Sequence, residues 1–303
     1  MDDTLGVRDK AVLAVKGVVS ALPKLGLLKK PRFHPDGVSF IVAVKDEERW
    51  IKPCIQSIQD IANEIIVVDS SVHDNTTKIV DELTVNNDKI KHIRFYWDGS
   101  NAFALSLHIG LVSVNYKWVF KWDSDLVAKN PEAMKEWIGR LKHLDKDRYY
   151  VIDVPRINLE GDLKHHPKSL PFGAYEGRLF TWSPELRYAL KDNHYEQLTG
   201  DSVWGHRLPA WFNNIRWHEP YIFHCNIKSP KRMLMRQYWG EYMIHKESRF
   251  QSLEEYTSYR VKTDLNLTMD EAIRKKMAEV QAGLIPYDKV RFGELPEVLK
   301  GLE

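Results

Sequence analysis

Val38-Ser-Phe-Ile-Val-Ala-Val44 is a β-branched, apolar run, and it decides the fold that we expect of this chain. A helical pattern follows from Asp46 through Ile61, and then comes a second apolar run, Glu64-Ile-Ile-Val-Val-Asp69. A strand, a helix and a second strand in this order predict a β-α-β unit.

The same alternation continues toward the C-terminus. The expected elements are a helix over 75–83, a strand over 90–95, a helix over 101–114, a strand over 117–122, a helix over 130–144 and a strand over 149–155. Continuous apolar strands between helices predict an α/β fold, with a mostly parallel central sheet that helices cover on both faces. Residues 156–230 lose the alternation and are rich in aromatic residues, His, Pro and Gly, so we expect loops and a binding surface there.

The composition is that of an ordinary globular chain. Of the 303 residues, 43% are hydrophobic and 28% are charged, which is ample for a buried core. A formal net charge of +2 without a basic stripe argues against a nucleic-acid partner. The two cysteines, Cys54 and Cys225, are too few for a disulfide framework or a cysteine zinc site, so we expect a reducing, cytoplasmic environment.

The N-terminal segment, residues 10–30, carries a short amphipathic helical pattern. Residues 1–34 hold seven Lys/Arg against three Asp, so this helix either contacts an anionic membrane surface peripherally or packs on its own domain. The apolar stretch 11–28 is interrupted by Lys16, Pro23 and Lys24, which makes it a poor signal peptide. No stretch approaches the ~20 apolar residues of a membrane-spanning helix.

Asp123-Ser124-Asp125 follows the apolar strand expected over 117–122. Both carboxylates would therefore emerge at the carboxyl end of a strand, where open α/β sheets bind ligands. Mn²⁺ and Mg²⁺ prefer a few carboxylates together with substrate phosphates, so this pair suits a divalent cation that bridges a diphosphate. An Asp-x-Asp in a solvated surface turn is the alternative.

Asp69 ends another expected strand, and a polar turn that contains Asp74 follows it. A carboxylate at that strand end can accept a hydrogen bond from a nucleobase N–H, and it would lie on the same sheet edge as Asp123. Capping of the next helix by Asp69 or Asp74 is the alternative.

Three stretches together resemble the family 2 glycosyltransferases with the GT-A fold: Val38 to Glu48, Glu64 to Thr76, and Phe120-Lys-Trp-Asp-Ser-Asp125. The resemblance implies a donor of the nucleoside diphosphate sugar type, with UDP or GDP. It also implies site residues: Val44, Asp46 and Glu48 line the nucleotide site, Asp69 contacts the base, and Asp123 and Asp125 serve the ribose, diphosphate and metal. The chain departs from the family pattern at Ser70, where an acidic residue is usual, and at His108, where Asn is usual.

A catalytic base is expected near residue 200. Gly200-Asp201 followed by Arg207 resembles the Glu-Asp pair and later Arg of the family, although the Glu is missing. An inverting transferase needs a carboxylate that deprotonates the acceptor hydroxyl, and Asp201 is the first candidate and Glu196 the second. The alternative is that Asp201 caps a helix that runs to Leu208.

His224 stands at the head of a basic segment that includes Lys228, Lys231, Arg232 and Arg236. The imidazole could complete the metal shell, a role that the resemblance also implies, and Lys228 and Arg232 could hold the diphosphate. A hydrogen-bonded structural histidine is the alternative.

The expected organisation has four segments. They are an N-terminal amphipathic extension (1–37), a nucleotide-sugar-binding half (38–128), an acceptor-binding half of the same catalytic domain (129–235) and a helical C-terminal tail (236–303), with capping boxes at Ser252…Glu255 and Thr268…Glu271. The acceptor is a carbohydrate, a lipid-linked group or a protein, among which the sequence does not choose.

Other functions compete with this interpretation. Asp123-Ser-Asp125-Leu-Val127 also fits the nucleophile motif of haloacid-dehalogenase-like phosphatases, in which Asp123 would be phosphorylated. That class expects the motif on an early strand and a later acidic pair. A nucleotidyltransferase on a related fold usually begins with a Gly-rich, Arg-containing loop, which 38–46 lacks. A lectin-like or scaffold protein would not need the acidic and basic segments together.

Overall fold

The computed structural model describes residues 34–96, 102–144, 146, 148–169, 176–191, 195–200, 212–219, 221–244 and 250–302. The predicted amphipathic segment 10–30 and the candidate base Asp201 lie outside these residues.

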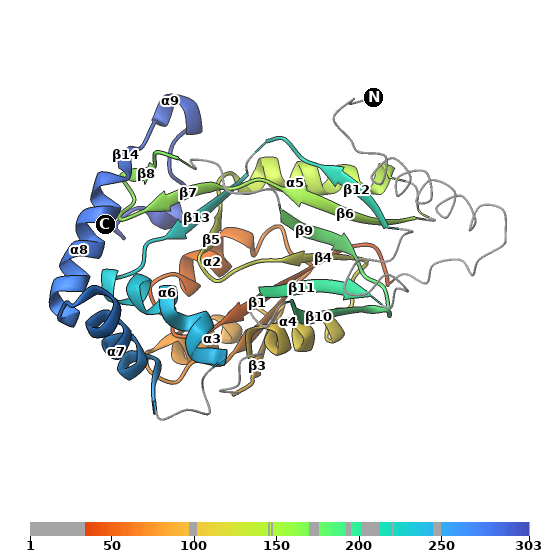
Figure 1. Cartoon of the computed structure of the whole chain (residues 1–303). Helices are drawn as coiled ribbons and strands as arrows, with labels where there is room; N and C mark the ends of the chain where they lie inside the picture. The colour runs from red at the N-terminus through yellow and green to blue at the C-terminus, as the bar shows by residue number, and fades with distance from the viewer. Residues whose placement is uncertain are drawn as a thin grey trace, which may run out of the picture.

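A seven-stranded sheet forms the centre of the molecule, in the order β12-β6-β9-β4-β1-β2-β3 (Figure 1). The strands are β1 (Val38–Val44), β2 (Glu64–Asp69), β3 (Ile90–Arg94), β4 (Trp118–Lys121), β6 (Tyr149–Val154), β9 (Glu176–Thr181) and β12 (Phe212–Arg216). All neighbours pair in parallel except β9, which is antiparallel to both β4 and β6. The α/β fold class with a mostly parallel central sheet is therefore confirmed.

Helices cover both faces of the sheet, because its central strands are apolar on both sides. One face carries the alternate residues Phe40, Val42, Ile65 and Val67 and packs against α2 (Ile51–Ile58), α3 (Thr76–Val85) and α5 (Pro131–Arg140). The other face packs Ile41, Ala43, Ile66 and Val68 against α4 (Ala102–Val112) and the hairpin of β10 (Leu186–Lys191) and β11 (Tyr195–Gly200). The hairpin and α4 thus form one wall above the sheet.

Residues 156–230 hold more regular structure than the sequence predicted. Besides β9 to β12, they contain β7 (Ile157–Glu160), β8 (His165–Pro167) and β13 (Ile222–Asn226). β13 lies between β7 and β5 (Leu126–Ala128), and β8 pairs with β14 (Leu284–Pro286). These strands are short and are shared among four small or mixed sheets, so no single period marks them in the sequence.

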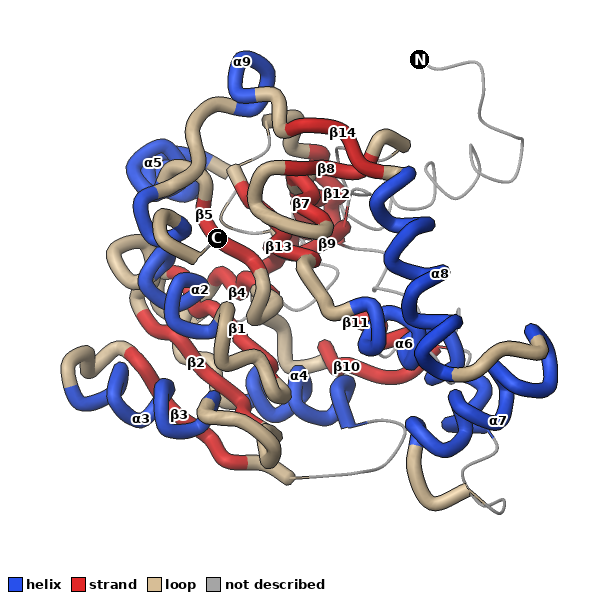
Figure 2. Tube along the Cα trace, turned by 90° about the vertical axis from the view of Figure 1, so that its left-hand side faces the viewer, coloured by secondary structure: helices blue, strands red, loops and turns tan. Residues whose placement is uncertain are grey.

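Three helices toward the C-terminus, α6 (Pro230–Ile244), α7 (Leu253–Leu265) and α8 (Met269–Ala282), form a group at one side of the molecule (Figures 1 and 2). They share an apolar cluster around Leu234, Tyr238 and Tyr256. The capping box at Thr268 is complete, whereas at Ser252 the Glu255 carboxylate accepts from the backbone N–H of Gln251 instead. The chain then continues through α9 (Lys289–Phe292). Two 3-10 helices complete the described elements: η1 (Leu141–His143), which follows α5, and η2 (Glu297–Leu299), which follows α9.

No helix within the described ranges has both the length and the apolar character needed to cross a membrane.

Candidate active site

One edge of the central sheet gathers the charged residues. The parallel strands β1, β2, β4 and β6 end there, and the antiparallel strand β9 begins there at Glu176. Because β4 ends at Lys121, the Asp123-Ser124-Asp125 segment leaves the sheet at the same edge. This is the edge at which open α/β sheets bind their ligands.

Asp123 is held between two buried cations. Its Oδ2 accepts a hydrogen bond from Arg178 Nη2 at 2.8 Å, and its Oδ1 lies 3.8 Å from Lys121 Nζ. Burial alone would raise the pKa of Asp123, but Arg178 and Lys121 outweigh it and lower that pKa well below its usual range. Asp123 is therefore a carboxylate at neutral pH. Its Oδ1 is buried and accepts no hydrogen bond from the described residues.

Asp125 meets His224 and Lys228, which are about 100 residues later in the chain. The pairing of β13 with β5 sets His224 opposite Leu126, and this register brings His224 Nε2 to 3.5 Å and Lys228 Nζ to 3.0 Å from Asp125 Oδ2. Burial would raise the pKa of Asp125, but His224 and Lys228 hold it below its usual range. The predicted grouping of Asp125 with His224 is thus present.

The donor atoms at this edge suit a divalent cation. His224 Nδ1 lies 3.0 Å from Asn158 Oδ1, and since an amide oxygen only accepts, Nδ1 donates there and Nε2 is the ring nitrogen that faces Asp125 and could bind a metal. The free Oδ1 of Asp123 adds a second oxygen ligand. Within the described residues no three His, Cys, Asp or Glu side chains form a ready cage. Mg²⁺ and Mn²⁺ sites that share a nucleotide use one or two carboxylates and complete the shell with phosphates, so the set fits such an ion.

Glu47 is a site residue that the sequence reasoning missed. It is buried, and its Oε1 accepts hydrogen bonds of 2.6 Å from both Lys228 Nζ and Arg232 Nη2. Arg232 also approaches the carbonyl oxygen of Asp46 at 3.4 Å. Glu47 therefore fixes the two cations expected to bind a diphosphate beside Asp125. The available signal was a pair of complementary segments: the acidic run Asp46-Glu47-Glu48, and the basic segment after His224, which has no acidic residues.

The loops that follow β1 and β2 are tied together by the residues that the resemblance gives to the nucleotide. Asp46, at a left-handed φ of 51°, accepts hydrogen bonds from the backbone N–H groups of Val72 and His73 at 2.9 and 3.0 Å. Glu48 Oε2 accepts from the backbone and side-chain amides of Asn75 at 3.0 and 2.9 Å. Val44 is buried, and its carbonyl oxygen accepts from Ser70. These side chains brace the loops against each other.

Asp74 takes part in the same bracing. Its Oδ2 accepts from the backbone N–H of Glu48, and its Oδ1 accepts from that of Thr76 in the first turn of α3. It therefore supports the turn that leads into α3, whose N-cap residue is Asn75.

Asp69 is completely buried at the end of β2. It accepts hydrogen bonds from the backbone N–H of Ser71 at 2.7 Å and from Thr77 Oγ1 at 2.8 Å, and it pairs with His92 at 3.2 Å and with Arg94. Burial would raise the pKa of Asp69, but the hydrogen bonds from His92, Ser71 and Thr77 lower it below its usual range. Arg94, whose side chain is 46% exposed, is thereby fixed at the edge where a nucleobase is expected.

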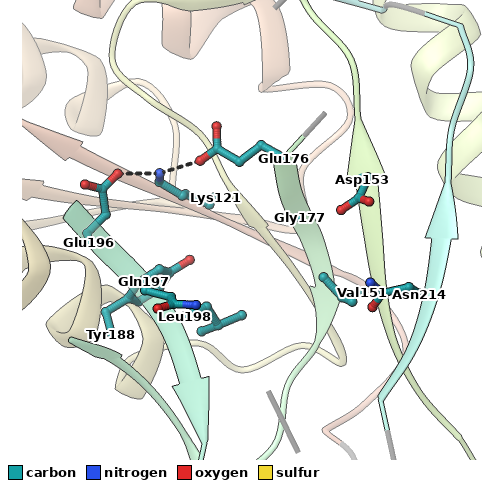
Figure 3. Close-up of a pocket in the computed structure, with 10 residues that line it drawn as sticks. All are labelled: Lys121, Val151, Asp153, Glu176, Gly177, Tyr188, Glu196, Gln197, Leu198 and Asn214. Atoms are coloured by element: carbon teal, nitrogen blue, oxygen red, sulfur yellow. Dashed lines mark hydrogen bonds and ion pairs between the residues drawn. The ribbon is translucent and has the colours of Figure 1, made fainter. Parts of the chain in front are cut away.

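Glu196 lies on β11, and Figure 3 shows it facing Lys121 across the mouth of a cavity. Its Oε1 accepts a 2.8 Å hydrogen bond from Lys121 Nζ, which also donates to Glu176 Oε1 at 2.9 Å. The cavity has a volume of about 250 Å³, and Asp153 lies on its far wall. The second candidate base therefore stands beside Asp123, with Lys121 between them.

This chain is similar to several known proteins. A TPR repeat-containing protein of Synechococcus elongatus is 23% identical over 189 residues, which are 62% of this chain but only 41% of that protein. Among solved structures, S. aureus TarS 1-349 in complex with UDP-GlcNAc matches with a TM-score of 0.44 and 13% identity, over 80% of this chain and 79% of that one. The mannosyltransferase PcManGT from Pyrobaculum calidifontis, in complex with GDP-Man and Mn²⁺, matches with a TM-score of 0.41 and 14% identity, over 94% and 86%.

The family is decided by the match of a whole family model. The model described as glycosyl transferase family 2 matches residues 39–207, which is more than half of the chain and includes β1, Asp69 and the Asp123-Ser124-Asp125 segment. The resemblance inferred from the sequence, and the GT-A type of α/β fold that it implied, are confirmed. The chain belongs to glycosyl transferase family 2.

Proposed function

We propose that this protein transfers a sugar from a nucleoside diphosphate sugar, of the UDP or GDP type, to a hydroxyl acceptor with the help of Mn²⁺ or Mg²⁺. The observation that carries the proposal is the meeting of Asp123, Asp125, His224 and Lys228 at the ligand-binding edge of the sheet. Family membership supports the reaction class and argues against the phosphatase and nucleotidyltransferase alternatives.

Lys228 and Arg232 would hold the diphosphate. Both are already fixed by Glu47, so little side-chain entropy remains to be lost when a phosphate replaces part of this pairing. The Lys228 side chain is 9% exposed and Arg232 is 48% exposed, which places one cation deep in the site and one at its rim. Arg232 can offer a fork of two N–H groups to a phosphate.

A metal ion would be held by Asp123, Asp125 and His224. When bound, it supplies Lewis-acid stabilisation of the negative charge that grows on the leaving diphosphate. Asp125 is central to this set, because it contacts both His224 and Lys228.

The nucleoside would lie along the loops after β1 and β2. This edge is shaped by the loop of residues 70–75, which Val44, Asp46 and Glu48 fix in place. Asp69 contacts the base directly or through the exposed guanidinium of Arg94.

The acceptor hydroxyl must lose a proton as it attacks the anomeric carbon. For an inverting reaction the base stands on the face opposite the diphosphate, and we assign this role to Asp201, with Glu196 as the second candidate. Glu196 forms an ion pair with Lys121 beside Asp123. The acceptor is a carbohydrate, a lipid-linked group or a protein.

Calorimetry with UDP, GDP and dTDP, each with and without Mn²⁺, tests the proposal. We expect one of the nucleotides to bind, and Mn²⁺ to tighten its binding in the wild type but not in Asp125→Asn. Asp60→Asn makes the same chemical change at an exposed site and should behave as the wild type. Binding of none of the three nucleotides would overturn the proposed function, and undiminished turnover in Asp125→Asn would overturn the metal assignment.

A further inference from the structure

The cavity beside Lys121 is bounded by the sheet on one side and by the β10–β11 hairpin on the other (Figure 3). Its polar lining comes from Lys121, Asp153, Glu176, Glu196, Gln197 and Asn214. Its volume of about 250 Å³ lies below the ~300–1,000 Å³ of pockets for drug-sized ligands, so it suits a single ring better than a chain of rings.

Two of the residues that line the cavity each have a polar atom with no partner within the described part of the chain. These atoms are Tyr188 Oη and Gln197 Oε1, and both are buried. Tyr188 is only 7% exposed, so bulk water has little access to its hydroxyl. A buried polar group without a partner destabilises the structure, and a ligand that brings hydrogen-bonding groups into the cavity would remove that penalty.

The charged side chains of the lining favour uncharged ligands over anionic ones. The ammonium of Lys121 is already paired with Glu176 and Glu196, and the second oxygen of Glu176 accepts from Arg156 and Arg178. On the far wall, burial raises the pKa of Asp153. Carboxyl groups thus outnumber ammonium groups in the lining by three to one. An anionic ligand would find no unpaired ammonium among the described residues of the lining, whereas uncharged hydroxyl groups can donate to these carboxylates.

The cavity also adjoins the reaction centre. Lys121 Nζ, which lines it, lies 3.8 Å from Asp123 Oδ1. A ring in the cavity would therefore sit next to the groups assigned to the diphosphate and the metal.

We propose that this cavity binds one uncharged, hydroxyl-bearing sugar ring through Tyr188, Gln197 and Glu196, and that it discriminates against acidic sugars. The inference rests on the proposed function and deepens it, since it names the class of sugar. The ring is either the sugar that is transferred or the terminal sugar of the acceptor, and the experiment separates these sources.

The test compares Tyr188→Phe with Thr199→Val. Thr199 lies on the same hairpin and also has a buried hydroxyl without a partner among the described residues, but it does not line the cavity. In the donor arm, calorimetry with Mn²⁺ measures UDP against UDP-glucose and UDP-glucuronic acid, and GDP against GDP-mannose. In the acceptor arm, methyl glucoside and methyl glucuronide are titrated into the protein saturated with the preferred nucleotide.

We expect Tyr188→Phe to weaken sugar binding about tenfold in one arm, which is the loss of one hydrogen bond, while the Kd of the bare nucleotide stays unchanged. Thr199→Val should leave both arms unchanged. Methyl glucuronide or UDP-glucuronic acid should bind at least about tenfold more weakly than its uncharged counterpart.

The outcomes separate the two proposals. If the wild type binds neither UDP nor GDP, the proposed function fails whatever the cavity does. If a nucleotide binds but Tyr188→Phe weakens sugar binding in neither arm, the sugar site is overturned while the transferase remains. Equal binding of acidic and uncharged sugars overturns the charge selection.

Discussion

Lys228 forms an ion pair of 3.0 Å with Asp125 at the point where a divalent cation is expected. The same ammonium is held at 2.6 Å by Glu47, so it has a second carboxylate to which it can turn. A cation that binds Asp125 must displace or repel this ammonium, whereas a diphosphate would attract it. Metal and nucleotide should therefore respond in opposite directions when Lys228 is removed.

Lys228→Met should bind Mn²⁺ several-fold more tightly in the absence of nucleotide, because Asp125 loses a competing cation. The same variant should bind UDP or GDP about tenfold more weakly, because a charge-assisted hydrogen bond to phosphate is lost. Two calorimetric titrations measure both effects. Lys231→Met is the control, since Lys231 pairs with Glu254 outside the site and should change neither. A parallel loss of both affinities would show that Lys228 only supports the local structure.

Arg178→Met should destabilise the fold. Arg178 is 2% exposed and is the hydrogen-bonded partner of both Asp123 and Glu176, whose side chains are 24% and 37% exposed, so its removal deprives two partly buried carboxylates of this cation. Breaking a fully buried pair typically lowers the free energy of unfolding by about 3–5 kcal/mol, and the partial exposure of the two carboxylates should make the loss here smaller. Urea denaturation measures the loss. Arg140→Met breaks an exposed pair with Glu136 and should have little effect, and equal stabilities of the two variants would contradict the importance of the buried network.

The pair of His92 with Asp69 and Asp81 should make stability depend on pH. His92 lies 3.2 Å from Asp69 and 2.7 Å from Asp81, and its hydrogen bond with Asp69 raises the pKa of the imidazole despite its burial. A raised pKa in the folded state stabilises the protein fully below the unfolded value of about 6.5, and this contribution is lost as the pH rises through the folded pKa. The stability difference between wild type and His92→Gln should therefore shrink as the pH rises above about 6.5. Denaturation at several pH values checks the sign, and a difference that grows with pH would contradict it.

Gly110→Ala should destabilise the contact between α4 and the sheet. A Cβ at this position would lie 2.3 Å from Ile41 Cγ2 in β1, so the helix or the strand must move. Overpacking of this kind costs about 1–3 kcal/mol, which exceeds the ~1 kcal/mol that Ala gains over Gly in a helix. Gly139→Ala in α5 is the matched control, because nothing lies within 4 Å of its added Cβ, and it should raise the melting temperature. A rise in melting temperature for both variants would show that α4 is free to shift.

The β-α-β core was predictable because each of its elements carries its own signal. The runs 38–44 and 64–69 are buried throughout, so every position in them had to be apolar or internally paired. The start of α5 was equally local, since Asn130 accepts from the N–H of Ala133 and Pro131 follows it. The helix predicted from Asp46 instead begins at Ile51, because Asp46 adopts a left-handed conformation that serves the neighbouring loop.

The candidate site was predictable only where a motif marked it. Asp125 and His224 were named from sequence, and the pairing of β13 with β5 brings them together. Arg178 and Glu47 were missed because their roles depend on partners 55 and 181 residues away in sequence. A buried arginine in the strand Glu176–Thr181 was a usable signal, since a guanidinium is rarely buried without a carboxylate.

The bracing between the loops after β1 and β2 has a consequence for how this protein can diverge. Asp46 and Glu48 accept hydrogen bonds from backbone N–H groups of residues 72–75, and Asp74 accepts one from the backbone N–H of Glu48. Each loop therefore depends on the other. A substitution in one loop leaves an orphaned N–H or carboxylate in the other. A lineage that acquires a new nucleotide preference at this edge would therefore have to change both loops together. We expect residues 46–48 and 72–75 to co-vary among related sequences.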